Sequence, residues 1–153
     1  MKLSTKGRYG LRAMVDLAVN SQDGPVSILS IAKRQNISEN YLEQIIALMK
    51  KAGLVYSHRG AGGGYQVSKP LNEISVGDII VALEGDLNIV NCPGFSDSEV
   101  DTGAECSASD LCVTKYVWGK VNLAIKETFD SISLEELAIE SKQMLENKTK
   151  SYS

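Results

Sequence analysis

Two closely spaced helical patterns in the first 70 residues constrain the fold more than any other feature of this chain. Ser27 can cap a helix over residues 28–35, and Ser38 can cap a second helix that runs to Lys51. Asn36 can adopt the left-handed conformation that ends the first of these helices. Two short helices joined by so tight a turn are typical of a helix-turn-helix.

An earlier helix is predicted from Gly10 to Asn20, where apolar residues recur at helical spacing. The turn sequence Asp23-Gly24-Pro25 follows it and marks its end. The three helices together offer enough apolar side chains for one small core. The apolar positions that they carry are Leu11, Met14, Val15, Leu17, Ala18, Leu29, Ile31, Ala32, Tyr41, Leu42, Ile45, Ile46, Leu48 and Met49.

A glycine-rich hairpin is predicted next, with strands over 54–56 and 65–68. The glycines between them permit the positive φ angles and close backbone approach of a tight tip. A basic residue at such a tip can enter a minor groove or bind phosphate, which makes Arg59 and Gly60 candidate contacts. His58, the only histidine, is interpreted as a residue near phosphate rather than as a metal ligand. A nucleotide-binding glycine loop is disfavoured because no Gly-Lys-Ser/Thr follows.

Charge is divided unevenly along the chain, although the net charge is only −3. Residues 1–70 contain ten Lys and Arg against four Asp and Glu, whereas residues 71–153 contain six against fifteen. We therefore expect only the first half to bind a polyanion, double-stranded DNA. The exposed start of the second helix of a helix-turn-helix reaches base edges in the major groove. The candidate contacts there are Ser38, Glu39, Asn40, Tyr41, Glu43 and Gln44.

The acidic half predicts helices of a different kind. Ser75 and Asp78 can cap a short helix that ends at Glu84, and Ser133 with Glu136 forms a capping box for a last short helix through Ser141. Between them lies a helix of about five turns with a broad apolar stripe, which we expect to pair with a second copy in a symmetric homodimer. Its members are Val117, Trp118, Val121, Ala124, Ile125, Phe129 and Ile132.

The predicted fold class is mainly α with a small β wing (α+β). Residues 1–84 would form a winged helix-turn-helix DNA-binding domain with its connecting helix, 85–112 a cysteine-bearing loop, and 113–145 the dimerisation helix and C-terminal helix. Residues 146–153 are polar and are expected to fray. No run approaches the ~18 apolar residues of a membrane span, and the N-terminus has no signal-peptide pattern. We therefore expect a cytoplasmic protein.

The three cysteines, Cys92, Cys106 and Cys112, all lie in one polar segment. Clustered cysteines in a reducing compartment more often hold metal than form disulfides, and their odd number also counts against a disulfide framework. Thiolates select iron–sulfur clusters or zinc. Zinc sites usually show Cys-x2-Cys pairs and a fourth Cys or His, and neither is present. A redox role for the thiols without metal stays open.

The runs LSTKGRYGLRAMVDLA, SENYLEQIIALMKKAGLV and RGAGGGYQVSKP occur in this order. They resemble the Rrf-two family of bacterial winged-helix regulators, and the resemblance covers nearly the whole chain. It implies a dimeric transcription factor in which residues 38–44 enter the major groove and Arg59 enters the minor groove. In IscR-type members the glutamate that matches Glu43 helps to discriminate between DNA sequences according to cluster state.

The same resemblance implies that the three cysteines hold an iron–sulfur cluster, [2Fe–2S] rather than [4Fe–4S]. The chain departs from the IscR-type pattern in the longer interval between the first two cysteines and in Lys115, which stands in place of a histidine ligand. The nitric-oxide-sensing branch uses an N-terminal aspartate from the partner subunit, and the matching region here holds Arg8. Glu105, Asp110, another oxygen donor or an open iron position remains for the fourth site.

The expected function is a repressor or activator that senses cluster status and controls genes for cluster assembly. A cluster-free regulator of cysteine metabolism with the same fold, or a nitric-oxide-responsive repressor, is the alternative. A plain DNA-architectural module would show no operator preference. An enzyme is disfavoured because no paired carboxylates, nucleophile–base pair or catalytic histidine accompanies the cysteines.

Overall fold

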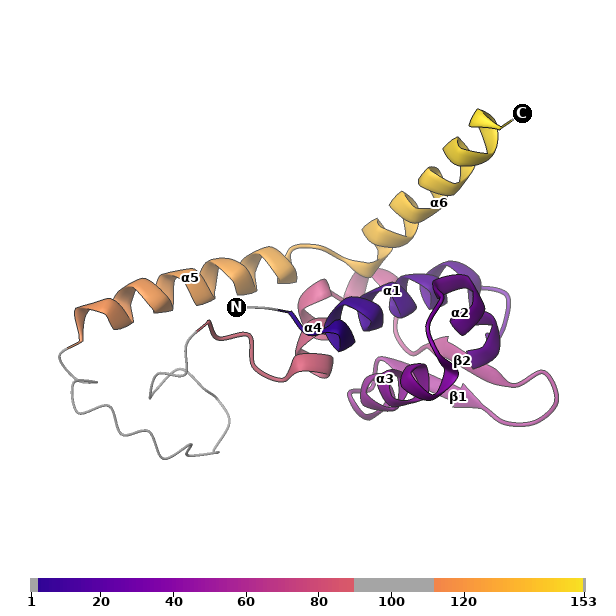
Figure 1. The fold of residues 1–153 in the computed structure, drawn as a ribbon, viewed down its shortest axis with the longest axis horizontal. Coiled ribbons are helices and arrows are strands. Elements are labelled where there is room, and N and C mark those ends of the chain that lie inside the picture. The colour runs from indigo at the N-terminus through magenta and orange to yellow at the C-terminus, as the bar shows by residue number, and fades with distance from the viewer. Residues whose placement is uncertain (1–2, 90–111, 153) are drawn as a thin grey trace.

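The computed structural model describes residues 3–89 and 112–152, and these form helices and one small antiparallel hairpin (Figure 1). The predicted α+β class is confirmed. The elements in chain order are α1 (Thr5–Asn20), α2 (Ile28–Gln35), α3 (Glu39–Lys51), β1 (Val55–His58), β2 (Gly64–Val67), the short 3-10 helix η1 (Leu71–Glu73), α4 (Val76–Glu84), α5 (Val113–Asp130) and α6 (Leu134–Ser151).

Both helices of the helix-turn-helix begin at the predicted cap residues. Ser27 accepts a hydrogen bond from the backbone N–H of Ser30, and Ser38 accepts one from that of Tyr41. Asn36 ends α2 in the left-handed conformation, with φ 54° and ψ 51°. The satisfied N–H groups at both helix starts explain why these two boundaries were predictable from the sequence.

The core is larger than the three N-terminal helices alone. Most of the apolar positions expected there are buried or packed against it, but Leu29 is 47% exposed and that prediction is wrong. The reason is that only one side of α2 is covered, and this side carries Ile31 and Ala32. Later elements complete the core: the fully buried large side chains are Met14, Leu17, Ile31, Leu42, Ile45, Ile46, Met49, Ile74, Ile79, Ile80 and Leu134.

Two glycines allow α1 and α4 to pack closely. A Cβ at Gly10 would collide with the buried side chain of Leu83, and one at Gly7 would collide with the carboxylate of Glu84. Glu84 also accepts hydrogen bonds from the backbone N–H and the hydroxyl of Ser4, the N-cap of α1. The Ser4 hydroxyl also caps the helix by accepting from the backbone N–H of Gly7, so α1 begins at Thr5, well before the predicted start.

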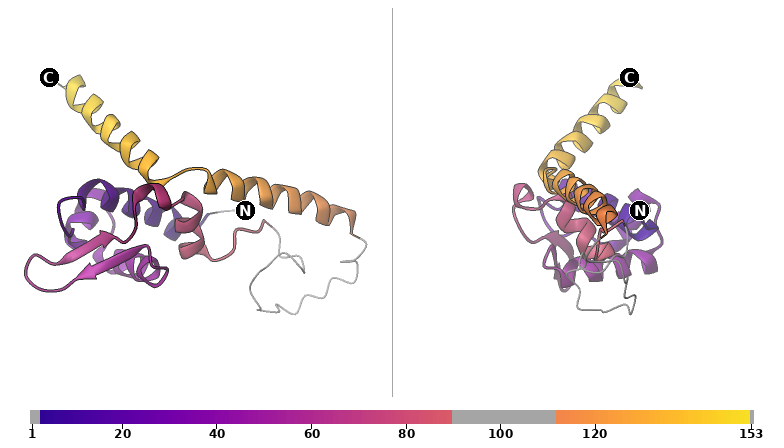
Figure 2. Two further views of the ribbon diagram at one scale, coloured as in Figure 1. Left: turned by 180° about the vertical axis from the view of Figure 1, so that it is seen from behind. Right: turned by 90° about the vertical axis from the view of Figure 1, so that its left-hand side faces the viewer.

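The last two helices project from this core in different directions (Figure 1 and Figure 2). Leu134 and Ala138 fasten the start of α6, and α6 then continues as an exposed helix to Ser151 instead of ending at Ser141. Helix α5, which the structure describes in full, contains no buried residue. Its contacts within the chain are chiefly with α4. They leave Val113, Tyr116, Val117 and Leu123 exposed, whereas Trp118, Val121, Ile125 and Phe129 are half-buried.

A buried carboxylate joins α1 to α2. The Asp16 side chain is 1% exposed and accepts two hydrogen bonds from the Arg34 guanidinium, at 2.9 Å from Nε and 2.6 Å from Nη2. Gln35 Nε2 donates a third at 2.9 Å. The hydrogen bonds to Asp16 raise the pKa of Arg34. A buried charge is tolerated only with such partners, so this pair fixes where α2 lies on α1.

We expect Arg34→Met to lower the free energy of unfolding by about 2 to 3 kcal/mol, because it leaves the buried Asp16 carboxylate without its cationic partner. Urea denaturation at equal protein concentrations measures the change. Lys33→Met is the matched control, since it removes an exposed cation of the same helix that takes no part in the Asp16 network. Equal losses in the two variants would contradict the importance given to the Asp16 pair.

Candidate nucleic-acid interface and metal ligands

The first turns of α3 present polar side chains to solvent. Ser38, Glu39, Asn40, Glu43 and Gln44 are all exposed. The opposite face of the helix is buried in the core through Leu42, Ile45, Ile46 and Met49. The structure therefore brings together five of the six residues predicted to contact bases and leaves them accessible from one side.

Tyr41, the sixth predicted contact, is half-buried. Its ring meets that of Tyr9 on α1 edge to face, with centroids 6.1 Å apart and planes at 84°. The Arg12 guanidinium lies over the Tyr9 ring, 5.4 Å from its centroid. Sequence reasoning missed Tyr9 and Arg12 as supports of the α3 N-terminus, because nothing in their local pattern points to a residue so distant in sequence.

The hairpin forms a wing beside the helix-turn-helix (Figure 1). Its strands pair antiparallel from Val55 opposite Val67 to His58 opposite Gly64. Arg59 and Gly60 follow at the exposed tip, where Gly60 has φ 97° and Gly62 has φ 78°. Glycine adopts such positive φ angles without steric cost, as the sequence predicted for this tip.

A further backbone contact fixes the wing to the helices. Val26, just before α2, exchanges two backbone hydrogen bonds with Tyr65 of β2, at 2.9 and 2.8 Å. A Cβ at the neighbouring Gly64 would collide with the Val26 carbonyl. Lys50 near the end of α3 donates to Ser57 Oγ of β1 at 2.9 Å. The wing therefore keeps a defined position relative to α3.

Of the three predicted metal ligands, the described residues include only Cys112, the N-cap residue of α5. Cys92 and Cys106 lie outside them, as do Glu105 and Asp110. Within residues 3–89 and 112–152 no group of three His, Cys, Asp or Glu side chains could hold a metal ion. The predicted three-cysteine site is therefore not tested by the geometry.

The surroundings of Cys112 favour a thiolate. The Cys112 Sγ lies 3.0 Å from Thr114 Oγ1. This contact is the main cause of the lowered pKa of the Cys112 thiol. The sulfur also stands at the positive end of the α5 dipole. Thiolates are the form of cysteine that binds metal, so Cys112 fits the donor chemistry of a metal or cluster ligand.

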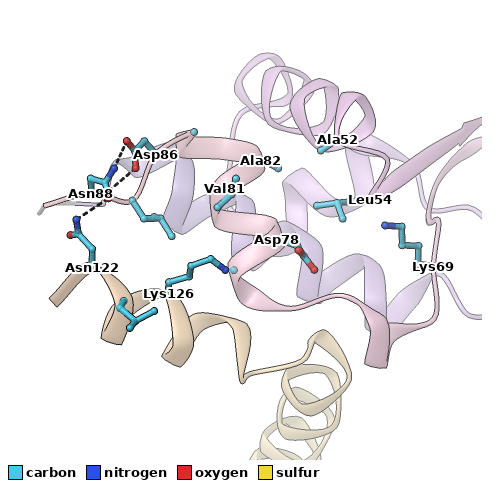
Figure 3. Close-up of a pocket in the computed structure, with 14 residues that line it drawn as sticks. Ala52, Leu54, Lys69, Asp78, Val81, Ala82, Asp86, Asn88, Asn122 and Lys126 are labelled. Carbon is cyan, nitrogen blue, oxygen red and sulfur yellow. Dashed lines mark hydrogen bonds between the residues drawn. The ribbon is translucent and has the colours of Figure 1, made fainter. Parts of the chain in front are cut away.

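A cleft of about 920 Å³ lies where α4, α5 and residues 85–88 meet (Figure 3). At its edge Asn122 of α5 donates from Nδ2 to Asn88 Oδ1 at 2.8 Å and accepts from the backbone N–H of Ile89 at 3.0 Å. Asn88 in turn donates to Asp86 at 2.6 Å. The cysteine-bearing segment is thus attached to α5 at both ends, at Asn122 and at Cys112. Sequence reasoning missed this role for Asn122.

The family model named Rrf2 (Rrf-two), described as an iron-dependent transcriptional regulator, matches residues 3–140. The chain belongs to the Rrf2 family. One of its relatives is the HTH-type transcriptional regulator IscR of Pectobacterium carotovorum. The two are 39% identical over 146 residues, which is 95% of this chain and 84% of the relative. The protein is therefore a transcriptional regulator that binds DNA.

Solved structures of Rrf2 regulators have the same fold. T. potens IscR is 44% identical with a TM-score of 0.73, over 94% of this chain and 90% of the other. CymR (YrzC), the global cysteine regulator of B. subtilis, is 41% identical with a TM-score of 0.71, over 90% of this chain and 96% of the other. None of the helices in the described part of this chain is long and apolar enough to cross a membrane.

Alkylation of Cys112 in metal-free protein should begin at a lower pH than that of an ordinary thiol, whose pKa is about 8.5. The lowered pKa means that the reactive thiolate is already present below that value. Cys92→Ser/Cys106→Ser protein isolates the Cys112 reaction with iodoacetamide across a pH series. Thr114→Val should raise the midpoint, whereas Thr128→Val, which removes a hydroxyl bonded to the Ala124 carbonyl, should not. An unchanged midpoint in Thr114→Val would contradict the assigned cause.

Proposed function

We propose that this chain is a regulator whose affinity for DNA depends on an iron–sulfur cluster held by Cys92, Cys106 and Cys112. The observation that carries the proposal is the place of Cys112, a thiolate-favouring ligand at the start of the exposed helix α5. Its similarity to regulators named IscR over most of the chain supports the same function. Control of cluster-assembly genes is part of the proposal.

The DNA contacts belong to the same proposal. The exposed first turns of α3, from Ser38 to Gln44, would enter the major groove, where Asn40 and Gln44 can pair with adenine and Glu43 can accept from cytosine. Tyr41 would contact DNA from its half-buried position against Tyr9. At the wing tip, Arg59 and Gly60 would lie in the adjacent minor groove.

The chain's donor set suits a cluster better than zinc. Three thiolates supply soft ligands, and Lys115, one turn into α5, is not a histidine that could complete a zinc site. The fourth position would be filled by Glu105, Asp110 or an oxygen donor of the partner subunit, and [2Fe–2S] is favoured over [4Fe–4S]. When bound, such a cluster supplies redox and oxygen-sensitive chemistry. Cys112 would attach the cluster to the start of α5.

Coupling between the cysteine segment and DNA would pass through α5 and α4. The Asn122 contacts hold Asn88 and Ile89 against α5, and Glu84, at the end of α4, holds the start of α1. A change in the segment therefore acts on elements that are already bonded to the DNA-binding domain. Coupling of this kind is typically about 1–3 kcal/mol, or about 5- to 150-fold in affinity.

A homodimer is the proposed assembly, and a cytoplasmic location goes with it. Tyr116, Val117 and Leu123 of α5 are 66%, 47% and 55% exposed. Pairing this helix with that of a second copy would cover these side chains and present two α3 helices to half-sites about 34 Å apart. An Rrf2 regulator of cysteine metabolism that needs no cluster is the second candidate, favoured by the 41% identity to CymR.

Protein purified without oxygen should contain equal amounts of iron and acid-labile sulfide and absorb visible light. Cys92→Ala, Cys106→Ala and Cys112→Ala should each abolish this absorption while the protein remains folded, because each removes a ligand. Elemental analysis measures the iron, a sulfide assay the sulfide, absorption spectroscopy the visible bands, and circular dichroism the folding. Full iron content in all three variants would show that the site assignment is wrong. Colourless protein after reconstitution would favour the cluster-free regulator.

Asn122→Ala should keep its iron content but lose much of the difference in DNA affinity between the cluster-loaded and apo forms. The reason is that this change releases Asn88 and Ile89 from α5 without touching a cysteine. Fluorescence anisotropy on both forms measures the difference. Glu127→Gln, an exposed position on the same helix, should retain the wild-type ratio. An unchanged ratio in Asn122→Ala would exclude this route of coupling.

A further inference from the structure

One face of the wing carries a hydrogen-bonded network around His58, the residue expected from the sequence to lie near phosphate. Tyr56 Oη lies 3.0 Å from Gln66 Oε1, and His58 Nε2 lies 2.6 Å from the same oxygen. Gln66 Nε2 donates to the backbone carbonyl of Ser21, just after α1, at 2.8 Å. The rings of Tyr56 and His58 are 4.8 Å apart. Two strands and the end of α1 are thereby joined through one amide.

The chemistry of this network fixes the hydrogen on His58. A backbone carbonyl can only accept, so the Gln66 atom that faces Ser21 must be its NH2 group. The Gln66 oxygen must then accept from both Tyr56 and His58. His58 Nε2 therefore carries a hydrogen whether the ring is neutral or charged, and a second proton can be added only at Nδ1.

The Nδ1 atom is in a position to meet DNA. His58 is exposed and directly precedes Arg59 at the wing tip, and within residues 3–89 and 112–152 no hydrogen-bond partner is found for Nδ1. The charged residues next to the members of this network are few: Arg59 follows His58 in the chain, Asp23 follows Ser21 by two residues, and Lys50 of α3 is bonded to the neighbouring Ser57. The other titratable side chains of the hairpin are the phenols Tyr56 and Tyr65.

We propose that His58 binds a DNA phosphate through Nδ1 and takes up one proton there when the wing binds DNA. This inference rests on the proposed DNA contact of the wing. A neutral Nδ1 presents a lone pair that repels phosphate oxygen, whereas a protonated Nδ1 donates a charge-assisted hydrogen bond to it. The proton comes from the buffer and returns to it on dissociation. Gln66 is the positioning residue, because it holds the ring with Nδ1 turned away from the network.

The test compares wild type with His58→Gln and His58→Lys on an operator that the wild-type protein has selected from a random duplex library. Glutamine keeps an amide donor close to the position of Nε2 but cannot be charged, and lysine keeps a charge throughout the range in which histidine titrates. Anisotropy at pH 6, 7 and 8 gives the affinities. Calorimetry in two buffers of different ionisation enthalpy gives the number of protons taken up.

Wild-type affinity should fall several-fold from pH 6 to pH 8, with net proton uptake on binding. His58→Gln should bind at every pH as wild type does at pH 8, and His58→Lys should show little pH dependence and bind tightly. At pH 6 the wild-type salt dependence, log K against log salt, should be steeper than that of His58→Gln by about 0.9 per subunit, the slope of one phosphate contact. A merely structural role for His58 would not produce proton uptake.

Two outcomes separate failure of the inference from failure of the proposed function. Selective DNA binding with the same pH profile and proton uptake in wild type and His58→Gln would overturn the role of His58 alone. Failure of the wild type to select any sequence would overturn both. Arg59→Ala serves as the matched control at the next residue: it should bind more weakly at every pH yet keep the dependence on pH.

Discussion

The position of α3 depends on one buried carboxylate. Asp16 is held in the interior by Arg34 and Gln35, the last two residues of α2. Helix α3 begins after only a short turn from α2, so the angle at which α2 meets α1 also sets the direction of α3. An apolar contact in the same place would permit sliding, whereas a bidentate ion pair with fixed geometry does not.

The same domain then acquires its remaining parts by backbone pairing. Val26 joins the wing to the entry of α2, and the pairing of Ser75 with Ser133 brings α6 back onto the core. Leu134 is fully buried as a consequence, and α5 emerges from a firmly held point although none of its own residues is buried. An exposed helix can therefore be directed outward without a core of its own.

Sequence reasoning succeeded where the relevant chemistry is local. Helix caps at Ser27, Ser38 and Ser75 satisfy nearby N–H groups, so the residue types themselves mark the boundaries. It failed where a distant residue decides the outcome. The exposure of Leu29 depends on which side of α2 other helices cover. The start of α1 has a local cap at Ser4 that sequence reasoning missed, and Glu84, 80 positions away, holds that cap in place.

The candidate site divides in the same way. The polar start of α3 and the wing tip were evident from residue type and order, whereas Tyr9 beneath Tyr41 and Asn122 beside Asn88 are brought there by tertiary packing alone. Likewise, the role of Gln66 became evident only from its hydrogen bond to the Ser21 carbonyl, since the direction of that amide determines which imidazole nitrogen of His58 donates to it.

The close approach of Gly10 to Leu83 has a consequence for recombination between related regulators. Because any side chain at that position would force α1 and α4 apart, the two helices are shaped as a matched pair, although more than 50 residues separate them in the chain. A crossover between them would join surfaces that were not shaped together. The natural unit of exchange therefore runs from α1 through α4 and also includes the start of α6, whose Leu134 is buried in the same core. A new sensing segment is best inserted between Gly85 and α6.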